Sequence, residues 1–392
     1  MSLNLSCRDY RTGEAVTVSF RDDEVDVVRR GEEDASTSLL FAPAFVDLQV
    51  NGQFGTDFSS PPSLSPGSLR RVARALWEQG VAYFFPTIVT GSFASTRQSL
   101  ELICALAKDP VLAGSLPGIH LEGPYIAAED GPRGAHPRVH VRPPSQREFA
   151  AWQEAAGGMI RLMTLAPELP GAPPFIRALR AEGVLIAIGH TDAGAEDIKN
   201  AVTAGAMLST HLGNATHALL RRHPNYLWEQ LAEDGLWASL IVDGHHLPPS
   251  VVKAMVRAKG AERCLLISDA AAVAGLPAGR YVFAGADIEL TSEGSVRLAG
   301  TDYLAGSALQ LPEAIHNVAM FAGLDQAVAL DMASHHPSLL LRLATPLSLE
   351  VFSHKTFTLL EWDEQGLKVK ATVVGGSVRH LSKDLRGEKS SS

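Results

Sequence analysis

The sequence predicts an α/β protein built around a (β/α)8 TIM-like barrel, with a small β-sandwich domain formed by both chain ends. Short apolar runs alternate with helical patterns through the middle of the chain, which is typical of parallel βα units. At both ends, apolar and polar residues alternate one by one, which is typical of half-buried antiparallel strands. The length of 392 residues accommodates a barrel of about 250 residues and a small second domain.

The barrel prediction depends on eight apolar runs that have the length of buried strands. Eight parallel strands with intervening helices close into a barrel. A doubly wound open sheet is the alternative, but it usually has a glycine-rich phosphate loop after its first strand, and Asn51–Gly55 lacks that pattern. The runs are Phe45–Val50, Ala82–Ile88, Pro117–Leu121, Ile160–Leu165, Val184–Ile188, Ala206–Thr210, Trp237–Val242 and Cys264–Ser268. The helical patterns include Ser68–Gln79, Thr96–Lys108, Phe175–Glu182, Ala195–Ala204 and Ser250–Lys259.

The two strand-rich ends are expected to pair with each other beside the barrel. We therefore assign residues 1–42 and 345–382 to the small β domain, residues 43–344 to the barrel and residues 383–392 to a disordered tail. The alternating segments behind this assignment are Ala15–Phe20, Glu24–Val28, Phe357–Leu360 and Leu367–Val374.

Composition excludes several classes of function. The net charge is −9 and no Lys/Arg cluster is present, so nucleic-acid binding is not expected. No apolar run approaches the roughly 18 residues of a membrane span. The polar N-terminus lacks the core of a secretory signal, so we expect a cytoplasmic protein. Cys7, Cys104 and Cys264 are too far apart for a disulfide framework, which fits a reducing compartment.

Polar residues close several of the predicted strands, at the end of the barrel where active sites lie. Glu122 follows the third run, His190 the fifth, His211 the sixth and Asp269 the eighth. A single histidine or carboxylate at a strand end is more often structural. Three nitrogen and oxygen ligands with one open position, however, are the layout of a catalytic zinc site. The set as a whole therefore indicates a metal-dependent hydrolase.

At these residues the chain resembles the N-acetylglucosamine-6-phosphate deacetylase family of the amidohydrolase superfamily. The matching segments run in family order between residues 43 and 320. Single segments are weak evidence, except His120–Pro124 and Thr210–Leu212, but the whole set is specific. The segments are Pro43–Gly52, Gly118–Tyr125, Arg133–Pro137, Gly189–Asp192, Thr210–Ala215, Val242–His246, Ser268–Ala270 and Leu304–Ser307.

The end of the first strand predicts a single metal ion per chain. Many amidohydrolases have His-x-His there, which binds a second metal, whereas this chain has Gln49 and Asn51. Neutral amides are poor zinc ligands, and the family includes single-metal members with the same Gln-x-Asn pair. The resemblance implies that Glu122, His190 and His211 bind one divalent ion. Zinc is expected, with iron(II) as the alternative.

The resemblance also implies a reaction, the hydrolysis of the N-acetyl amide of N-acetylglucosamine 6-phosphate to glucosamine 6-phosphate and acetate. The metal polarises the carbonyl and lowers the pKa of its bound water. Asp269 is expected to accept a proton from this water as general base and to return it to the departing amine as general acid. His136 resembles the family histidine that helps to polarise the acyl carbonyl.

Substrate-binding residues follow from the same resemblance. Arg222 lies eight residues beyond Asn214, where the family has an arginine that binds the sugar phosphate of the neighbouring subunit. This implies a homodimer in which Arg222 acts in trans, and a guanidinium suits a phosphate. His246 resembles a residue that contacts the sugar phosphate. The remaining expected substrate-binding residues are Ala135, Asn214, Ala215, Leu304, Ala305 and Gly306.

Three departures from the family pattern lie where the sugar should bind. Gly213 replaces the usual aromatic residue, and Thr216 with His217 follows where methionine is usual. The stretch Asn225–Leu231 is bulkier than the glycine-rich loop of typical members. The sugar epimer and the need for the phosphate therefore stay open. Two other functions are alternatives: an amidohydrolase acting on an N-acyl amino acid or a cyclic amide, and a non-catalytic metal-binding barrel. Arg222 and His246 argue against the first, and Asp269 argues against the second.

Overall fold

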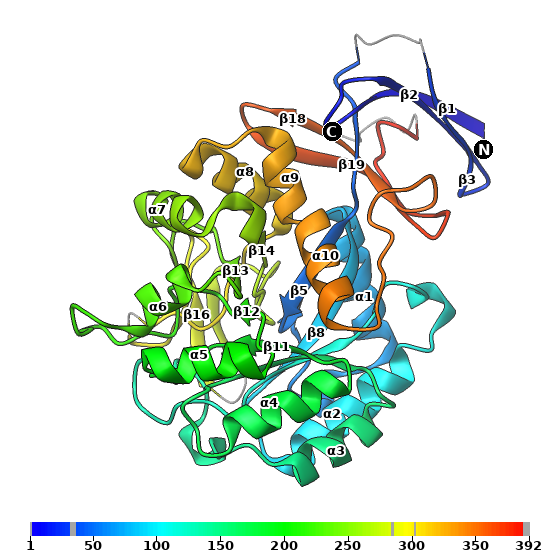
Figure 1. The fold of residues 1–392 in the computed structure, drawn as a ribbon. Coiled ribbons are helices and arrows are strands. Elements are labelled where there is room, and N and C mark those ends of the chain that lie inside the picture. Colours follow the sequence, from blue (N-terminus) through cyan, green and yellow to red (C-terminus); the bar gives the residue numbers. More distant parts are fainter. Residues whose placement is uncertain (1, 32–36, 284–285, 302, 387–392) are drawn as a thin grey trace.

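The computed structural model describes residues 2–31, 37–283, 286–301 and 303–386, and it has a large α/β part and a small β part (Figure 1). Both chain ends lie at the small part. Residues 387–392 of the predicted tail lie outside the described residues. The predicted fold class, a TIM-like barrel with a small β domain, is confirmed.

Eight parallel strands form the barrel. Their order, β14-β13-β12-β11-β10-β9-β8-β5, follows the chain around the sheet. The last strand meets the first through a bridge between Val50 and Ala270 and through a hydrogen bond from Asp269 N to Gln49 O of 3.0 Å. The strands are β5 (Phe45–Val50), β8 (Val81–Val89), β9 (Ile119–Glu122), β10 (Ile160–Leu165), β11 (Leu185–Ile188), β12 (Leu208–Ser209), β13 (Trp237–Leu240) and β14 (Cys264–Leu266).

Each predicted apolar run forms one of these strands, because its side chains are buried on both faces, as parallel sheets require. The largest difference is β12, which has two residues where five were predicted. Thr210 N still donates to Ile188 O at 2.8 Å, but His211 adopts a φ of 32°, which ends the strand.

Helices surround the barrel, and polar side chains cap several of them. Ser65 and Ser68 form a capping box at α1, and Asn225 accepts two backbone N–H groups at the start of α6. The α-helices are α1 (Pro66–Glu78), α2 (Phe93–Leu106), α3 (Gln146–Ala155), α4 (Ala172–Ala181), α5 (Ala195–Ala204), α6 (Tyr226–Ala232), α7 (Pro249–Lys259), α8 (Leu311–Ala322), α9 (Gln326–Met332) and α10 (His335–Ala344). Short 3-10 helices are η1 (Pro61–Ser63), η2 (Pro110–Leu112), η3 (Arg138–His140) and η4 (Ala261–Arg263).

Strands from both chain ends form the small β part as one closed sheet, in the order β1-β2-β3-β20-β19-β18-β4. Parallel pairing of β1 with β4 and a bridge between Ser377 and Glu24 complete the circle. Alternate residues of β2, such as Val16 and Val18, fill its core. The strands are β1 (Ser2–Asp9), β2 (Ala15–Arg21), β3 (Glu24–Arg30), β4 (Leu40–Ala42), β18 (Phe357–Asp363), β19 (Gly366–Val374) and β20 (Ser377–Leu381).

An inserted sheet that the sequence did not predict lies between β14 and α8. It consists of β15 (Gly279–Phe283), β16 (Ala286–Leu290) and β17 (Val296–Leu298). The chain leaves the barrel after Ala270 and returns beside it at Ser307, through a bridge between these two residues. A further two-stranded sheet, β6 (Gly52–Gln53) with β7 (Thr56–Asp57), follows β5.

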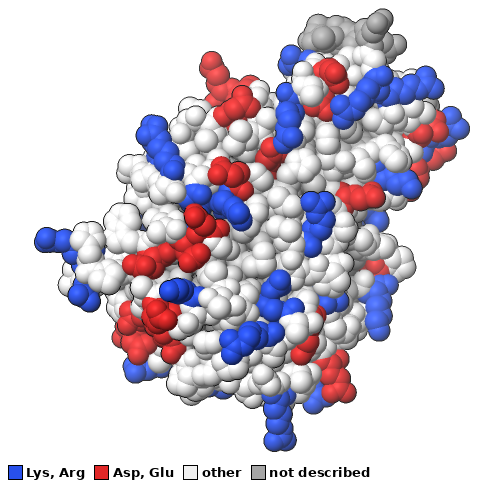
Figure 2. Space-filling model, viewed as in Figure 1, with Lys and Arg blue, Asp and Glu red and all other residues white. Residues whose placement is uncertain are grey.

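Surface charge is mixed on the face shown in Figure 2, where acidic and basic side chains lie among each other. None of the described helices has the length and apolar character needed to cross a membrane.

Asp331 of α9 joins the small β part to the barrel. The Tyr10 hydroxyl donates to Asp331 at 2.9 Å, and the Arg11 guanidinium forms an ion pair with the same carboxylate. We expect Asp331→Ala to lower the free energy of unfolding by about 1.5–3 kcal/mol, because a buried charged acceptor is lost. Denaturant unfolding measures this change. Asp26→Ala, which removes an exposed ion pair with Arg21, is the control and should cost less than about 1 kcal/mol. Equal losses would contradict the assignment.

Candidate active site

A cavity of about 270 Å³ opens at the C-terminal ends of the barrel strands. It contains most of the residues predicted from the sequence. Gln49 is buried in the barrel below it, and Arg222 is exposed and absent from its described lining. The predicted residues that line the cavity are Asn51, Glu122, Ala135, His136, His190, His211, Asn214, Ala215, His246, Asp269, Leu304, Ala305 and Gly306.

The three predicted ligands converge on one point. Oε1 of Glu122 lies 3.2 Å from Nε2 of His190 and 2.9 Å from Nε2 of His211, and the two Nε2 atoms are 3.1 Å apart. Tetrahedral ligands at about 2.0–2.1 Å from zinc are themselves about 3.3 Å apart. Nδ1 of His190 lies 2.9 Å from the Pro132 carbonyl, so it carries the proton and Nε2 is left as a ligand. These residues therefore fit one divalent ion.

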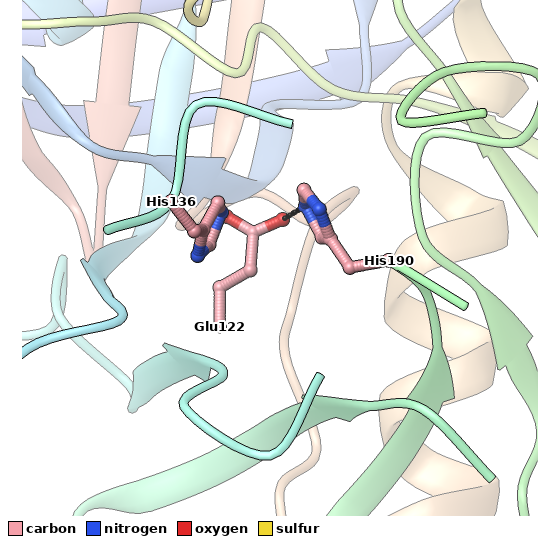
Figure 3. Close-up of side chains that lie close together, drawn as sticks. All are labelled: Glu122, His136 and His190. Atoms are coloured by element: carbon pink, nitrogen blue, oxygen red, sulfur yellow. Dashed lines mark hydrogen bonds and ion pairs between the residues drawn. The ribbon is translucent and has the colours of Figure 1, made fainter. Parts of the chain in front are cut away.

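His136 lies beside this group. Its ring centroid is 4.2 Å from that of His190, and potential ligand atoms of Glu122, His136 and His190 lie within 4.8 Å of one another. Figure 3 shows Glu122 between the two rings, with one His136 nitrogen facing the carboxylate and the other facing away. His211 is nonetheless the better third ligand, because its Nε2 lies about 3 Å from both Glu122 and His190. Nδ1 of His136 lies 2.7 Å from the Thr90 hydroxyl.

Burial raises the pKa of both site carboxylates, but their neighbours leave the two pKa values on opposite sides of the usual range. Burial raises the pKa of Glu122, but hydrogen bonds with His190 and His211 outweigh it and place the pKa well below its usual value. Burial, and then the negative charge of Glu122, raises the pKa of Asp269 to about 6. Burial also lowers the pKa of His136 well below its usual value. The ionised Glu122 therefore suits cation binding, whereas Asp269 suits proton exchange near neutral pH. Active sites often contain two carboxylates whose environments separate their pKa values in this way.

Gln49 and Asn51 act as hydrogen-bond donors at the end of β5. Nε2 of Gln49 bridges Oε1 of Glu122 at 3.0 Å and Oδ1 of Asp269 at 2.8 Å. Nδ2 of Asn51 donates to the same Asp269 oxygen at 2.7 Å. Both amides thus approach the carboxylates through N–H groups. They orient Asp269 through Oδ1, and neither amide contacts its Oδ2.

The backbone is left-handed at three of the strand ends. His190, His211 and Asp269 have φ values of 52°, 32° and 50°. This conformation is uncommon outside glycine and costs about 1–3 kcal/mol where the structure enforces it. Such residues gather at active sites, so their coincidence with the predicted ligands and proton carrier independently marks the site.

The outer wall of the cavity comes from the inserted sheet, which sequence reasoning missed. Ala286, Ile288, Leu298 and Tyr303 line this side. The alternation of polar and apolar residues in Ala286–Leu290 was the signal available for it. Among the described residues that line the cavity, none is a lysine or an arginine.

His246 lines the cavity. Its Nδ1 lies 2.6 Å from Asp243, whereas the neighbouring His245 binds the Glu293 carbonyl outside the cavity. Of the departures from the family pattern, Gly213 and Thr216 line the cavity. His217 does not line it, and its Nδ1 lies 3.0 Å from the Tyr226 hydroxyl.

The chain is similar to several known deacetylases of N-acetylated amino sugar 6-phosphates. N-acetylglucosamine-6-phosphate deacetylase of Bos taurus is 34% identical over 350 residues, covering 86% of this chain and 83% of the relative. N-acetylgalactosamine-6-phosphate deacetylase of a Shewanella species is 33% identical over 302 residues, covering 77% and 74%. The structure of N-acetyl-D-glucosamine-6-phosphate deacetylase from Mycobacterium smegmatis with N-acetyl-D-glucosamine-6-phosphate has a TM-score of 0.83 at 26% identity, covering 97% and 100%. No family model matches the chain.

Gly123, directly after Glu122, allows close packing beneath the site. Its φ is 78°, and a Cβ there would lie 2.2 Å from the Thr90 hydroxyl oxygen. Gly13 has a similar φ of 73°, but a Cβ there would meet none of the described atoms within 4 Å. We expect Gly13→Ala to cost about 1–2 kcal/mol of stability from the backbone alone. Gly123→Ala should cost about 1–3 kcal/mol more from the contact. Chemical denaturation of both variants tests this, and similar losses would contradict it.

Proposed function

The chain belongs to the N-acetylglucosamine-6-phosphate deacetylase family, and we propose that it hydrolyses the N-acetyl amide of an amino sugar 6-phosphate, with N-acetylglucosamine 6-phosphate as the first candidate substrate. It is an enzyme of the amidohydrolase type. The observation that carries the proposal is the convergence of Glu122, His190 and His211 beside Asp269 in one cavity.

We assign one divalent metal ion to Glu122, His190 and His211, with zinc as the preferred metal. Imidazole and carboxylate ligands suit zinc and also ferrous iron. When bound, the ion would supply the Lewis acidity that activates water and polarises an amide carbonyl. The donors of Gln49 and Asn51 point toward Asp269, which supports one metal rather than two.

Proton transfer is assigned to Asp269. Gln49 and Asn51 both donate to its Oδ1, so Oδ2 can accept a proton from the attacking water and deliver it to the leaving amine nitrogen. His136 is assigned to donate a hydrogen bond to the acyl carbonyl as negative charge develops there. The products are acetate and the amino sugar phosphate.

We further propose that the enzyme is a homodimer and that Arg222 of one subunit binds the phosphate in the other. Arg222 is exposed, and the described cavity lining of the single chain contains no lysine or arginine. A phosphate dianion in this cavity would therefore need a cation from outside it. His246, backed by Asp243, is the residue within the chain assigned to the sugar phosphate.

The sugar epimer is the point on which a second candidate substrate has support. One relative is named for N-acetylgalactosamine 6-phosphate, and Gly213 and Thr216 change the cavity wall. The test is acetate release from N-acetylglucosamine, N-acetylgalactosamine and N-acetylmannosamine, each with and without a 6-phosphate. Turnover of N-acyl amino acids or cyclic amides alone would overturn the proposal.

The free thiols of Cys7, Cys104 and Cys264 support a cytoplasmic location.

Glu122 and Asp269 should separate metal binding from proton transfer. Glu122→Gln should lose both the metal and activity, because an amide is a poor zinc ligand. Asp269→Asn should retain about one metal ion per chain while kcat falls by about 10²–10⁴. Metal analysis with steady-state kinetics distinguishes the two, and Asp331→Asn, far from the cavity, should retain both properties. Two tightly bound ions per chain, or near-parental turnover by Asp269→Asn, would contradict these roles.

Arg222 should affect only phosphorylated substrates. Because a charge-assisted hydrogen bond contributes about 1.5–3 kcal/mol, Arg222→Ala should raise KM for the 6-phosphate by about ten- to a hundredfold and barely change turnover of the unphosphorylated sugar. The neighbouring Arg221→Ala is the control and should have little effect.

Mixed dimers test whether Arg222 acts in trans. With the 6-phosphorylated substrate far below its KM, chains carrying Arg222→Ala or Asp269→Asn should each have little activity alone. A mixed dimer has one site with intact Asp269 and the neighbour's intact Arg222, so activity should partly return. No recovery in confirmed mixed dimers would place Arg222 in its own subunit or outside the reaction.

A further inference from the structure

Thr90, at the end of β8, forms a buried contact with His136 that the sequence did not predict. Its Oγ1 lies 2.7 Å from Nδ1 of His136, and the two residues are 4% and 7% exposed. Gly123 leaves room for this hydroxyl, since a Cβ at Gly123 would lie 2.2 Å from it. The contact therefore depends on three segments packed against one another, and it lies directly behind the cavity.

The direction of this hydrogen bond decides what His136 can do. A neutral imidazole carries one N–H, and its other nitrogen is an acceptor. If Nδ1 carries the proton, Nε2 offers a lone pair, and His136 could act as a further metal ligand beside Glu122 and His190. If Nδ1 accepts a proton from Thr90, Nε2 carries the N–H and can donate to a carbonyl oxygen.

Two observations favour donation by Thr90. Among the described residues, Nδ1 of His136 is the one hydrogen-bond partner of the Thr90 hydroxyl, so it is the acceptor available to the hydroxyl proton. In addition, Glu122, His190 and His211 already form a compact ligand set, with pairwise distances of 2.9–3.2 Å. In a catalytic site with three protein ligands the fourth position belongs to water or substrate, so a bare Nε2 on His136 would compete with them for it.

We infer that Thr90 is a positioning residue, which donates its hydroxyl proton to Nδ1 of His136 and so keeps an N–H on Nε2, directed at the acyl carbonyl of the substrate. This inference rests on the proposed function, because that function supplies the acyl group. Thr90 would thus make His136 a hydrogen-bond donor instead of a fourth protein ligand to the metal.

Kinetics of the metal-loaded enzyme provide the first test. Thr90→Val keeps the side-chain shape but removes the hydroxyl, and kcat should fall by about 10- to 100-fold, somewhat less than the loss of a complete carbonyl donor. Metal content should stay at the parental value. Thr90→Ser restores the hydroxyl and should recover kcat to within about threefold. Thr358→Val, which removes a similarly buried hydroxyl from β18, is the matched control and should leave kcat unchanged.

A double-mutant cycle tests whether Thr90 acts through His136. Thr90→Val should have almost no further effect on kcat in a His136→Asn background, because the group that it orients is gone. An undiminished loss in that background would overturn the inference, since Thr90 would then act by another route. So would a Thr90→Val enzyme as active as the Thr358→Val control.

Tautomer measurement is independent of turnover. Protein labelled with ¹⁵N-histidine and loaded with zinc should show a proton on Nε2 of His136, with the signal assigned by its loss in His136→Asn. In Thr90→Val the proton should shift partly to Nδ1. A proton on Nδ1 in the parent would overturn the inference. If no amino sugar were hydrolysed, the proposed function would fail, while this spectrum would still decide the role of Thr90.

Discussion

The buried carboxylate of Glu122 is the constraint on which the rest of the site depends. An ionised carboxylate is stable in a protein interior only when several partners compensate its lost hydration. Here the partners come from three other strands: Gln49 from β5, His190 after β11 and His211 after β12. Each partner reaches Oε1 only if the barrel closes with its strands in register. The packing of the apolar barrel and the assembly of the polar site are therefore one structural requirement.

Closure of the barrel also fixes the second carboxylate. Asp269 N donates to the Gln49 carbonyl, while the Gln49 side chain donates to the Asp269 carboxylate, so the same pair of residues joins both the backbones and the side chains of β5 and the segment after β14. The left-handed backbone at His190, His211 and Asp269 is part of this arrangement. This backbone conformation is unfavourable by itself, so the packing of the surrounding sheet must stabilise it.

The sequence alone was enough to predict the barrel strands and to single out the polar residues at their ends. The strand runs were visible because buried parallel strands are continuously apolar, and Glu122, His190, His211 and Asp269 stood out because they end such runs. Two features could not be found this way. Ala286–Leu290 is short and lies between turns, so its alternation did not predict a sheet over the cavity. The role inferred for Thr90 depends on a contact with His136, which lies 46 residues away in the sequence, and no local sequence pattern predicts such a contact.

The attachment of the inserted sheet has an evolutionary consequence. Because the chain leaves the barrel after Ala270 and rejoins it beside the same residue at Ser307, the segment between them is an insertion with a small core of its own, which includes Val273, Ile288 and Val296. Its length and composition can drift without shifting the strands that carry Glu122 or Asp269. Substitutions in this segment would therefore alter the cavity wall that Ile288 and Leu298 form, while the strands that hold Glu122 and Asp269 stay in place.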